Sequence, residues 1–131
     1  MSQENVEIVR AVIDALNRGD VDAVLKDAAP DLEFDFSRAV GPAHGVFGPD
    51  ELPDLLREFD EPWQSVRREA EEFIEAGEQI VTPLTSHHLG RDGLELQARV
   101  AMVWTISDGA IARVCFYQGR EEALEAAGLS E

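Results

Sequence analysis

Cysteine, long apolar runs and basic side chains are all scarce in this sequence, and each scarcity excludes a class of protein. The single cysteine, Cys115, has no partner within the chain, so a disulfide framework is excluded and a reducing compartment is expected. No apolar run approaches the roughly 20 residues that a membrane-spanning helix needs. The first residues lack the basic flank and apolar stretch of a secretory signal, so we expect a cytoplasmic protein.

The shortage of basic residues limits the partners of the chain. Its 11 lysine and arginine residues stand against 27 aspartate and glutamate residues, which gives a net charge of −16. Such a chain repels nucleic-acid phosphates and anionic lipid headgroups. We therefore predict no nucleic-acid partner and no membrane partner.

The length and composition are those of an ordinary globular domain. The chain has 131 residues, of which 44% are hydrophobic and 29% are charged, and these values favour one buried core. It contains no internal repeat, linker or low-complexity tract. We predict a single domain over residues 1–131.

Apolar spacing predicts a pair of helices at the start of the chain. Apolar side chains recur every three or four residues over residues 5–17, which is typical of an amphipathic helix. Gly19 supplies its stop. Asp20 is expected to cap a second, short helix that ends before Pro30.

A strand, a loop and a third helix are predicted next. Apolar and polar side chains alternate over residues 32–37, as in a strand with one buried face. Glycine and proline break any regular element over residues 38–49, which we interpret as a loop. Helical spacing returns over residues 52–59.

The second half of the chain predicts three long antiparallel strands. They cover residues 80–89, 94–106 and 111–118. We interpret residues 91–92 and 108–109 as two-residue hairpin turns between them. A last helix is expected over residues 120–127, and residues 65–76 are ambiguous, because their helix formers precede a run of strands.

Four stretches carry a resemblance to a known family. They are residues 17–23, 30–34, 103–111 and 117–129. Together with the order of the elements, they resemble the SnoaL-like branch of the nuclear transport factor two-like superfamily. The resemblance covers nearly the whole chain.

The resemblance implies an α+β fold, in which helices on the concave side of a curved antiparallel sheet form a cone around a pocket. It makes residues 65–76 a strand, against their propensity, and the outer face of the sheet a homodimer interface. Members include polyketide cyclases, ketosteroid isomerases, epoxide hydrolases and dehydratases, so the fold does not select a reaction. The closing stretch, residues 117–129, resembles that of many bacterial members, which implies a bacterial source.

The residues that resemble catalytic positions depart from the family pattern. Val12 stands where ketosteroid isomerases carry an oxyanion-stabilising tyrosine, and valine cannot donate a hydrogen bond. Their base falls at Asp35 or Phe36, and strand alternation turns Phe36 toward the pocket. Phe116 stands where the polyketide cyclases carry an acidic residue. These departures count against both proton-transfer mechanisms.

His88 and Arg99 are the best polar pair that remains. If both hairpin turns have two residues, His88 shares one face with Arg99, Val103, Val114 and Phe116. His87 then falls on the opposite face with Met102, Trp104, Cys115 and Tyr117. An imidazole could move a proton while a guanidinium steadies an enolate or a carboxylate. Asp35 could act as a base if its strand is bulged.

The expected ligand-binding residues are mainly apolar. They are Phe36, Trp63, Val103, Val114 and Phe116. We predict neither a cofactor nor a metal, because His87 and His88 are neighbours in a strand and point apart.

Three functional hypotheses follow. The first is a homodimeric protein that binds a small apolar or aromatic metabolite in the cone pocket. The second is a cofactor-independent isomerase, or an enzyme like a polyketide cyclase or an epoxide hydrolase, with His88 or Asp35 as general base and Arg99 as support. The third is a non-catalytic accessory dimerisation domain whose cavity is filled by side chains.

Overall fold

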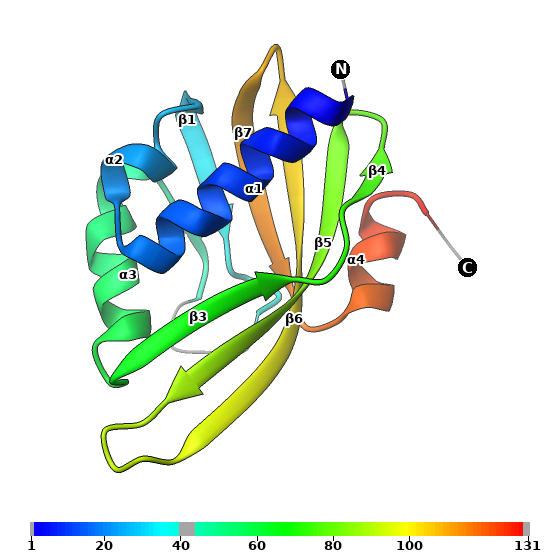
Figure 1. Cartoon of the computed structure of the whole chain (residues 1–131). Helices are drawn as coiled ribbons and strands as arrows, with labels where there is room; N and C mark the ends of the chain where they lie inside the picture. The colour runs from blue at the N-terminus through cyan, green and yellow to red at the C-terminus, as the bar shows by residue number, and fades with distance from the viewer. Residues whose placement is uncertain (1, 40–43, 130–131) are drawn as a thin grey trace.

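The computed structural model describes residues 2–39 and 44–129, and its central feature is a curved sheet (Figure 1). The strands follow the order β2-β1-β7-β6-β5-β3, and β4 pairs with β5. Neighbouring strands are antiparallel except for β1 and β7, which are parallel. The elements are α1 (Ser2–Arg18), α2 (Val21–Val24), β1 (Ala28–Asp35), β2 (Val46–Phe47), a 3-10 turn η1 (Pro49–Glu51), α3 (Leu52–Asp60), β3 (Ser65–Ala70), β4 (Ile74–Ala76), β5 (Gln79–Leu89), β6 (Glu95–Ser107), β7 (Ala110–Tyr117) and α4 (Arg120–Ala126).

The helices cover the two faces of the sheet unequally. Helix α1 crosses the concave face, with α2 and α3 beside it, while α4 lies at the far side of the strands (Figure 1). We call the face toward α1 the inner face and the face toward α4 the outer face. The α+β class, with helices on the concave side of a curved and mainly antiparallel sheet, is confirmed. No helix in residues 2–39 or 44–129 is long and apolar enough to cross a membrane.

Helices α1 and α2 have the apolar stripe and the N-terminal cap that the sequence predicts. The apolar stripe of α1 buries Val6, Val9 and Ile13 against the inner face. The Asp20 carboxylate accepts a hydrogen bond from the Ala23 amide at 3.1 Å, which is an N-terminal cap. Helix α2 is shorter than expected, because β1 already begins at Ala28 and pairs there with β7.

Residues 65–76 form strands, as the resemblance implied and helix propensity did not. Strand β3 pairs with β5 along its whole length, and β4 pairs with the start of β5. Exposed and half-buried residues alternate along β3, which is the pattern of an edge strand with one face toward the core. Sheet pairing therefore outweighs the local preference.

Two apolar clusters mark the two faces of the sheet. The inner cluster joins α1 and α3 to the sheet and includes Ile80, Leu84, Met102, Trp104 and Val114. The outer cluster joins the sheet to α4 and includes Val81, Ala101, Val103, Cys115 and Leu124.

The turn between β5 and β6 is one residue longer than predicted. Gly93 donates its amide to the Gly90 carbonyl at 3.0 Å, and Gly90 donates to Leu94 at 2.7 Å. Gly93 has φ +90, a left-handed conformation that glycine adopts without strain. The loop thus has three residues, and Leu89 pairs with Glu95.

The turn between β6 and β7 has two residues, as predicted, but a bulge follows it. Asp108 and Gly109 both have positive φ, at 54° and 78°, and Ser107 pairs with Ala110. The register then shifts between Thr105 and Ile106, so that Trp104 lies opposite Val114.

Each shift reverses the faces of β6 relative to its neighbour. Arg99 and Val103 therefore lie on the outer face, and Met102 and Trp104 lie on the inner face. The prediction that His88 shares a face with Arg99 and Val103 is wrong. Because each shift moves the register by one residue, their effects cancel between β5 and β7. His88, Val114 and Phe116 therefore lie on the same face, as predicted.

The side chain of Asn17 fastens α1 to the edge of the sheet. Its Oδ1 accepts a hydrogen bond from the Arg68 amide at 2.7 Å, and its Nδ2 donates to the Arg68 carbonyl at 2.9 Å. These are the backbone groups that an edge strand leaves unpaired. The Asn17 amide therefore takes the place of a neighbouring strand at one position.

Asn17→Ala is expected to destabilise the fold. The change leaves two part-buried backbone groups of Arg68 without partners, which costs about 1–3 kcal/mol. Urea denaturation followed by circular dichroism measures the free energy of unfolding. Gln3→Ala, which removes an exposed side-chain hydrogen bond from the same helix, is the control. Equal unfolding free energies for the two variants would contradict the role of the Asn17 amide.

Candidate functional site

The imidazole of His88 lies on the inner face, near the end of β5. Its Nε2 is 2.8 Å from the Ser86 hydroxyl. Its Nδ1 is buried and has no hydrogen-bond partner within the described residues. Burial lowers the pKa of His88 below its ordinary value, and the nearby charge of Arg68 lowers it further. The ring is therefore neutral at pH 7, and Nδ1 keeps one unused hydrogen-bonding position.

Trp63 covers this imidazole from the turn after α3. The two ring centroids are 4.7 Å apart and the planes are inclined by 55°. The tilted indole ring of Trp63 therefore forms part of the apolar surroundings of the imidazole. The predicted ligand-binding residue Trp63 and the predicted catalytic residue His88 thus lie together.

Arg68 and Asp60 form an ion pair that borders the same region. The Arg68 guanidinium donates to the Asp60 carboxylate at 2.8 Å, and Arg68 is mostly buried. Arg68 stands opposite Ser86 in the sheet, two residues along β3 from Val66, the partner of His88. The pair joins β3 to the end of α3 and holds a positive charge near His88.

A hollow of about 560 Å³ opens beside His88, at the end of the β5–β6 hairpin. Its apolar wall includes Val66, Leu89 and Leu96, and Asn17 closes its inner end. Leu96 is 51% exposed and Leu94, at the hairpin turn, is 70% exposed. Its lining also includes His87 beside His88, and the polar or charged residues Ser65, Arg67, Glu95 and Gln97. The hollow therefore combines exposed apolar side chains with a polar rim.

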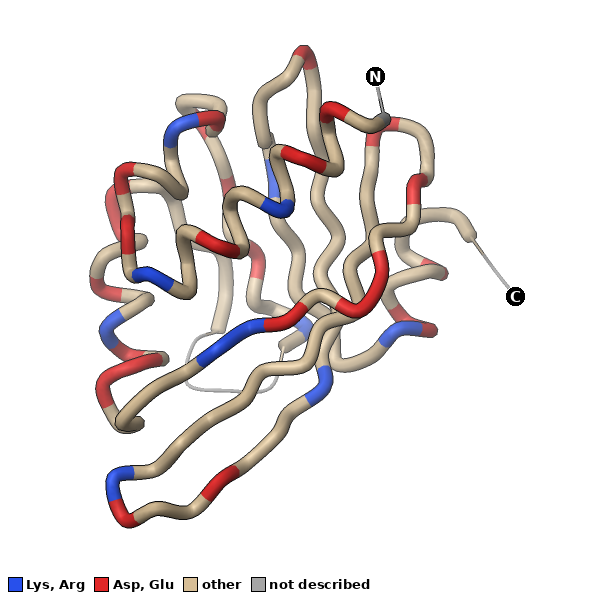
Figure 2. The backbone as a smooth tube through the Cα atoms, viewed as in Figure 1, with Lys and Arg blue, Asp and Glu red and all other residues tan. Residues whose placement is uncertain are grey.

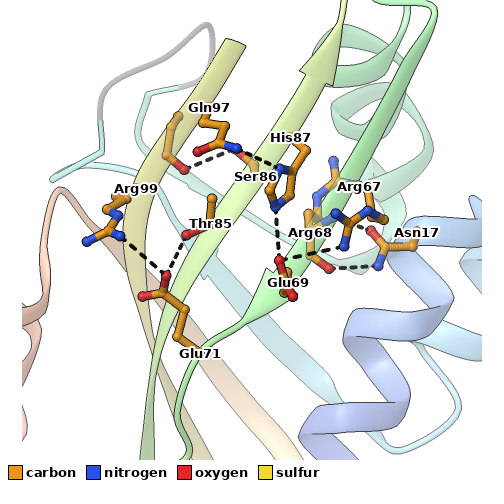
Figure 3. A network of polar contacts seen from close by, with 11 residues as sticks. Asn17, Arg67, Arg68, Glu69, Glu71, Thr85, Ser86, His87, Gln97 and Arg99 are labelled. Carbon is orange, nitrogen blue, oxygen red and sulfur yellow. Dashed lines mark hydrogen bonds and ion pairs between the residues drawn. The ribbon is translucent and has the colours of Figure 1, made fainter. Parts of the chain in front are cut away.

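His87, the residue before His88 on β5, belongs to a different network of polar side chains, on the outer face. His87 Nε2 lies 3.0 Å from the Glu69 carboxylate, and its Nδ1 lies 3.3 Å from the Gln97 amide. Glu71 accepts a hydrogen bond from Thr85 at 2.8 Å and faces the Arg99 guanidinium at 3.9 Å (Figure 3).

Arg99 lies in this outer network, away from His88. Its side chain is 82% exposed, so its ion pair with Glu71 is a surface contact that contributes little to stability. In the pairing of β5 with β6, Arg99 stands opposite Thr85, and paired residues share a face. Thr85 is an odd number of residues from His88 on β5, so Arg99 lies on the face opposite to His88. The structure therefore does not bring His88 and Arg99 together.

Asp35 also faces outward, and its buried carboxylate pairs with the partly exposed guanidinium of Arg113. Its carboxylate bonds to the Arg113 guanidinium and accepts the Ser37 hydroxyl at 2.6 Å and the Ser37 amide at 2.9 Å. Burial alone would raise the pKa of Asp35, but the Ser37 hydrogen bonds and the Arg113 charge outweigh it and lower the pKa. No bulge turns Asp35 inward, so it lies apart from His88.

Two further groups of the outer face lie close to Asp35. The Cys115 thiol is 3.4 Å from the Tyr117 hydroxyl. Burial raises the pKa of Cys115, and burial together with the Cys115 contact raises the pKa of Tyr117 to about 12. Both groups are therefore protonated at neutral pH and unreactive as nucleophiles or bases.

Phe36 lies inward, as predicted, at the centre of an aromatic cluster. It stacks on Phe116 with centroids 4.2 Å apart and planes 8° apart, and on Phe59 at 5.5 Å. Phe47 meets it edge to face at 5.9 Å. The Phe36 cluster, with buried Val114, fills the interior of the cone where β1 meets β7.

The predicted site is therefore divided along the sheet. Phe116 stands opposite Met102, while His88 stands opposite Leu96. These partners are six residues apart on β6, which is about 20 Å along an extended strand. The Phe36 cluster and the His88 imidazole therefore lie in different parts of the inner face.

Sequence reasoning missed the residues that surround His88. Ser86 is two residues before His88 on the same strand, and that spacing alone places both on one face. Arg68 and Asp60 had no such signal, because their meeting depends on how α3 and β3 pack. Within the described part of the chain, no three His, Cys, Asp or Glu side chains are grouped to hold a metal ion.

Comparison with known proteins identifies the fold. A family model described as a SnoaL-like domain matches residues 9–114. No curated protein matches the chain.

Several solved structures share this fold. TerC, crystallised with polyporic acid, is 20% identical with a TM-score of 0.74, over 95% of this chain and 97% of that one. An NTF2-like protein of unknown function from Burkholderia pseudomallei is 25% identical with a TM-score of 0.72, over 93% and 95%. The Δ5-3-ketosteroid isomerase from Mycobacterium sp. is 20% identical with a TM-score of 0.67, over 86% and 90%.

The contacts of the buried Asp35 carboxylate predict a specific dependence of stability on pH. Since folding lowers the pKa of Asp35, its stabilising contribution is complete above the ordinary value of 3.8 and is lost as the pH falls below it. We expect the unfolding free energy of Asp35→Asn to fall less steeply than that of the unmodified chain between about pH 5 and about pH 2.

Urea denaturation at several pH values tests this expectation. Asp31→Asn is the matched control, because Asp31 is an exposed carboxylate on the same strand. Parallel pH profiles for Asp35→Asn and Asp31→Asn would refute the contribution of the buried Asp35 carboxylate.

Proposed function

Because the chain belongs to the SnoaL-like domain family, we propose that it binds a small apolar or aromatic metabolite in the hollow beside His88. This membership confirms the resemblance seen in the sequence, and the superfamily is the NTF2-like one. The proposed ligand has a flat or apolar body and one polar group that meets the imidazole.

The observation that carries the proposal is the unpartnered Nδ1 of His88. A buried polar atom without a partner costs roughly 1–3 kcal/mol, so such atoms are rare in folded proteins. A ligand hydroxyl or carbonyl that reaches Nδ1 after Trp63 moves aside removes that cost. The neutral state of the ring suits a polar but uncharged group.

The walls of the hollow support an apolar body for this ligand. Val66, Leu89 and Leu96 offer only carbon surface, and Leu96 is half exposed without a ligand. Covering such surface is favourable by about 25 cal/mol per Å². A volume of about 560 Å³ is within the range of small-molecule sites.

Tryptophan fluorescence offers a direct test with polyporic acid, the compound crystallised with TerC. Trp104 is buried in the core, so quenching on binding reports mainly on Trp63. We expect saturable quenching by the probe, weakened about tenfold in His88→Ala through loss of one hydrogen bond.

His44 supplies the control. His44→Ala removes an exposed imidazole that lies outside the hollow and should leave the affinity unchanged. Equal loss in both histidine variants, or no saturable quenching by this probe, would count against a ligand site at His88.

A second candidate function is a cofactor-independent enzyme with His88 as general base. The neutral ring and the Ser86 hydroxyl at Nε2 favour it, since a base must be unprotonated at working pH. Asp35 and Arg99, the other predicted catalytic residues, would have to act from the opposite face. Binding alone therefore has the stronger support.

An assay with a Δ5-3-ketosteroid distinguishes these two candidates, since one structural neighbour is an isomerase of that name. We expect no isomerisation above the rate in buffer, because the inner face offers buried Val12 and Phe36 where proton transfer would need polar groups. Ultraviolet absorbance of the conjugated product measures the rate. Turnover that disappears in His88→Gln and persists in His44→Gln would favour the enzyme.

Three further expectations remain part of the proposal. A homodimer through the outer face and a bacterial, cytoplasmic setting follow from the resemblance and from the single cysteine. The accessory domain is the remaining alternative, and the filling of the cone by the Phe36 cluster supports it.

A further inference from the structure

A second hollow lies on the other side of Asn17, between α1 and the edge of the sheet. Its volume is about 330 Å³. Helix α1 and strand β3 form its two long walls, and the segment before β4 closes one end. The residues that matter for its chemistry are Arg10, Asp14, Arg67, Arg68, Glu69 and Phe73.

Positive charge is concentrated here against the trend of the whole chain. Three of the 11 basic residues line this one hollow, in a protein with a net charge of −16. Figure 2 shows a basic stretch on β3 and basic positions on α1, amid the acidic positions found on most other elements. An anionic group meets less repulsion here than elsewhere on the surface.

Two of the three guanidiniums keep donors that the protein does not use. Arg68 is already hydrogen-bonded to Asp60 at 2.8 Å. Arg10 is 3.8 Å from Glu7, and Arg67 is 3.7 Å from Glu69. Both separations exceed the 2.7–2.9 Å of a charge-assisted hydrogen bond. Arg10 and Arg67 can therefore donate to a ligand without breaking a short ion pair.

The position of Arg10 is fixed by an aromatic ring. Its guanidinium carbon lies 4.6 Å from the centroid of Phe73, which is a cation–π contact. The contact orients Arg10 before any ligand arrives, which reduces the entropy lost on binding. Phe73, with buried Ile13, also gives the hollow an apolar part.

One carboxylate in the hollow is equally unused. Asp14 follows Arg10 by four residues on α1, so both point from the same side of the helix. Asp14 is exposed, and in residues 2–39 and 44–129 its carboxylate makes no hydrogen bond or ion pair. The hollow thus offers two guanidiniums whose ion pairs are long and one carboxylate that has no partner among the described residues.

We propose that this hollow binds a small zwitterion of the amino-acid type with an apolar side chain. Its carboxylate lies between Arg10 and Arg67, its ammonium group meets Asp14, and its side chain rests on Phe73. A polyphosphate is disfavoured, because Asp14 and Glu69 would repel its several negative charges. This hollow shares Asn17 and Arg67 with the hollow beside His88, but His88 is not part of its lining.

Three probes with the same aromatic body test the proposal by titration calorimetry at low salt. They are L-phenylalanine, phenylacetate, which lacks the amine, and phenethylamine, which lacks the carboxylate. We expect L-phenylalanine to bind at least about tenfold more tightly than either of the others, since each lacks one charge-assisted contact.

Variants locate the binding. Arg10→Gln and Asp14→Asn should each weaken L-phenylalanine binding about tenfold. Arg57→Gln, on α3 outside the hollow, and His88→Ala should leave it unchanged. Phenylacetate binding as tightly as L-phenylalanine, an unaffected Asp14→Asn, or no heat of binding with L-phenylalanine would each overturn the proposal.

Discussion

The amide of Asn17 is the contact on which the arrangement of both hollows depends. It pairs with the backbone of Arg68 as a neighbouring strand would, and so fixes the last turn of α1 against the edge of the sheet. Arg68 in turn reaches Asp60, at the end of α3. One side chain and one ion pair thus hold two helices and the edge strand together. The two hollows lie on either side of this junction, and Asn17 lines both.

Strand pairing gives adjacent residues of β5 opposite chemical surroundings. His87 is held between Glu69 and Gln97 on the outer face, where each ring nitrogen has a partner (Figure 3). His88 lies under Trp63 on the inner face, where one nitrogen has none. The difference arises from alternation alone, because successive side chains of a strand point to opposite faces. Only the buried ring is left with hydrogen-bonding capacity for another molecule.

Much of the fold could be predicted from the sequence, and the errors have a common physical cause. Helical spacing predicted α1, and strand alternation placed Phe36 inward. The faces of β6 were not predictable, because the extra Gly93 and the bulge near Ile106 each shift the register by one residue. Neither the longer turn nor the bulge changes the spacing of apolar residues along the sequence. Arg68 was missed for another reason, since its neighbours come from elements distant in sequence.

The aromatic packing inside the cone decides where a ligand site can form. Phe36 lies parallel to Phe116 at 4.2 Å, a separation that leaves no room for a third ring between them. The contacts of Phe36 with Phe47 and Phe59 would also be lost if the Phe36 cluster opened, so its interior is better occupied by its own side chains. The β5–β6 hairpin, in contrast, extends past the helices (Figure 1). Its apolar residues Leu94 and Leu96 have no such partners, so apolar surface that a ligand could cover lies at the open end rather than in the depth of the cone.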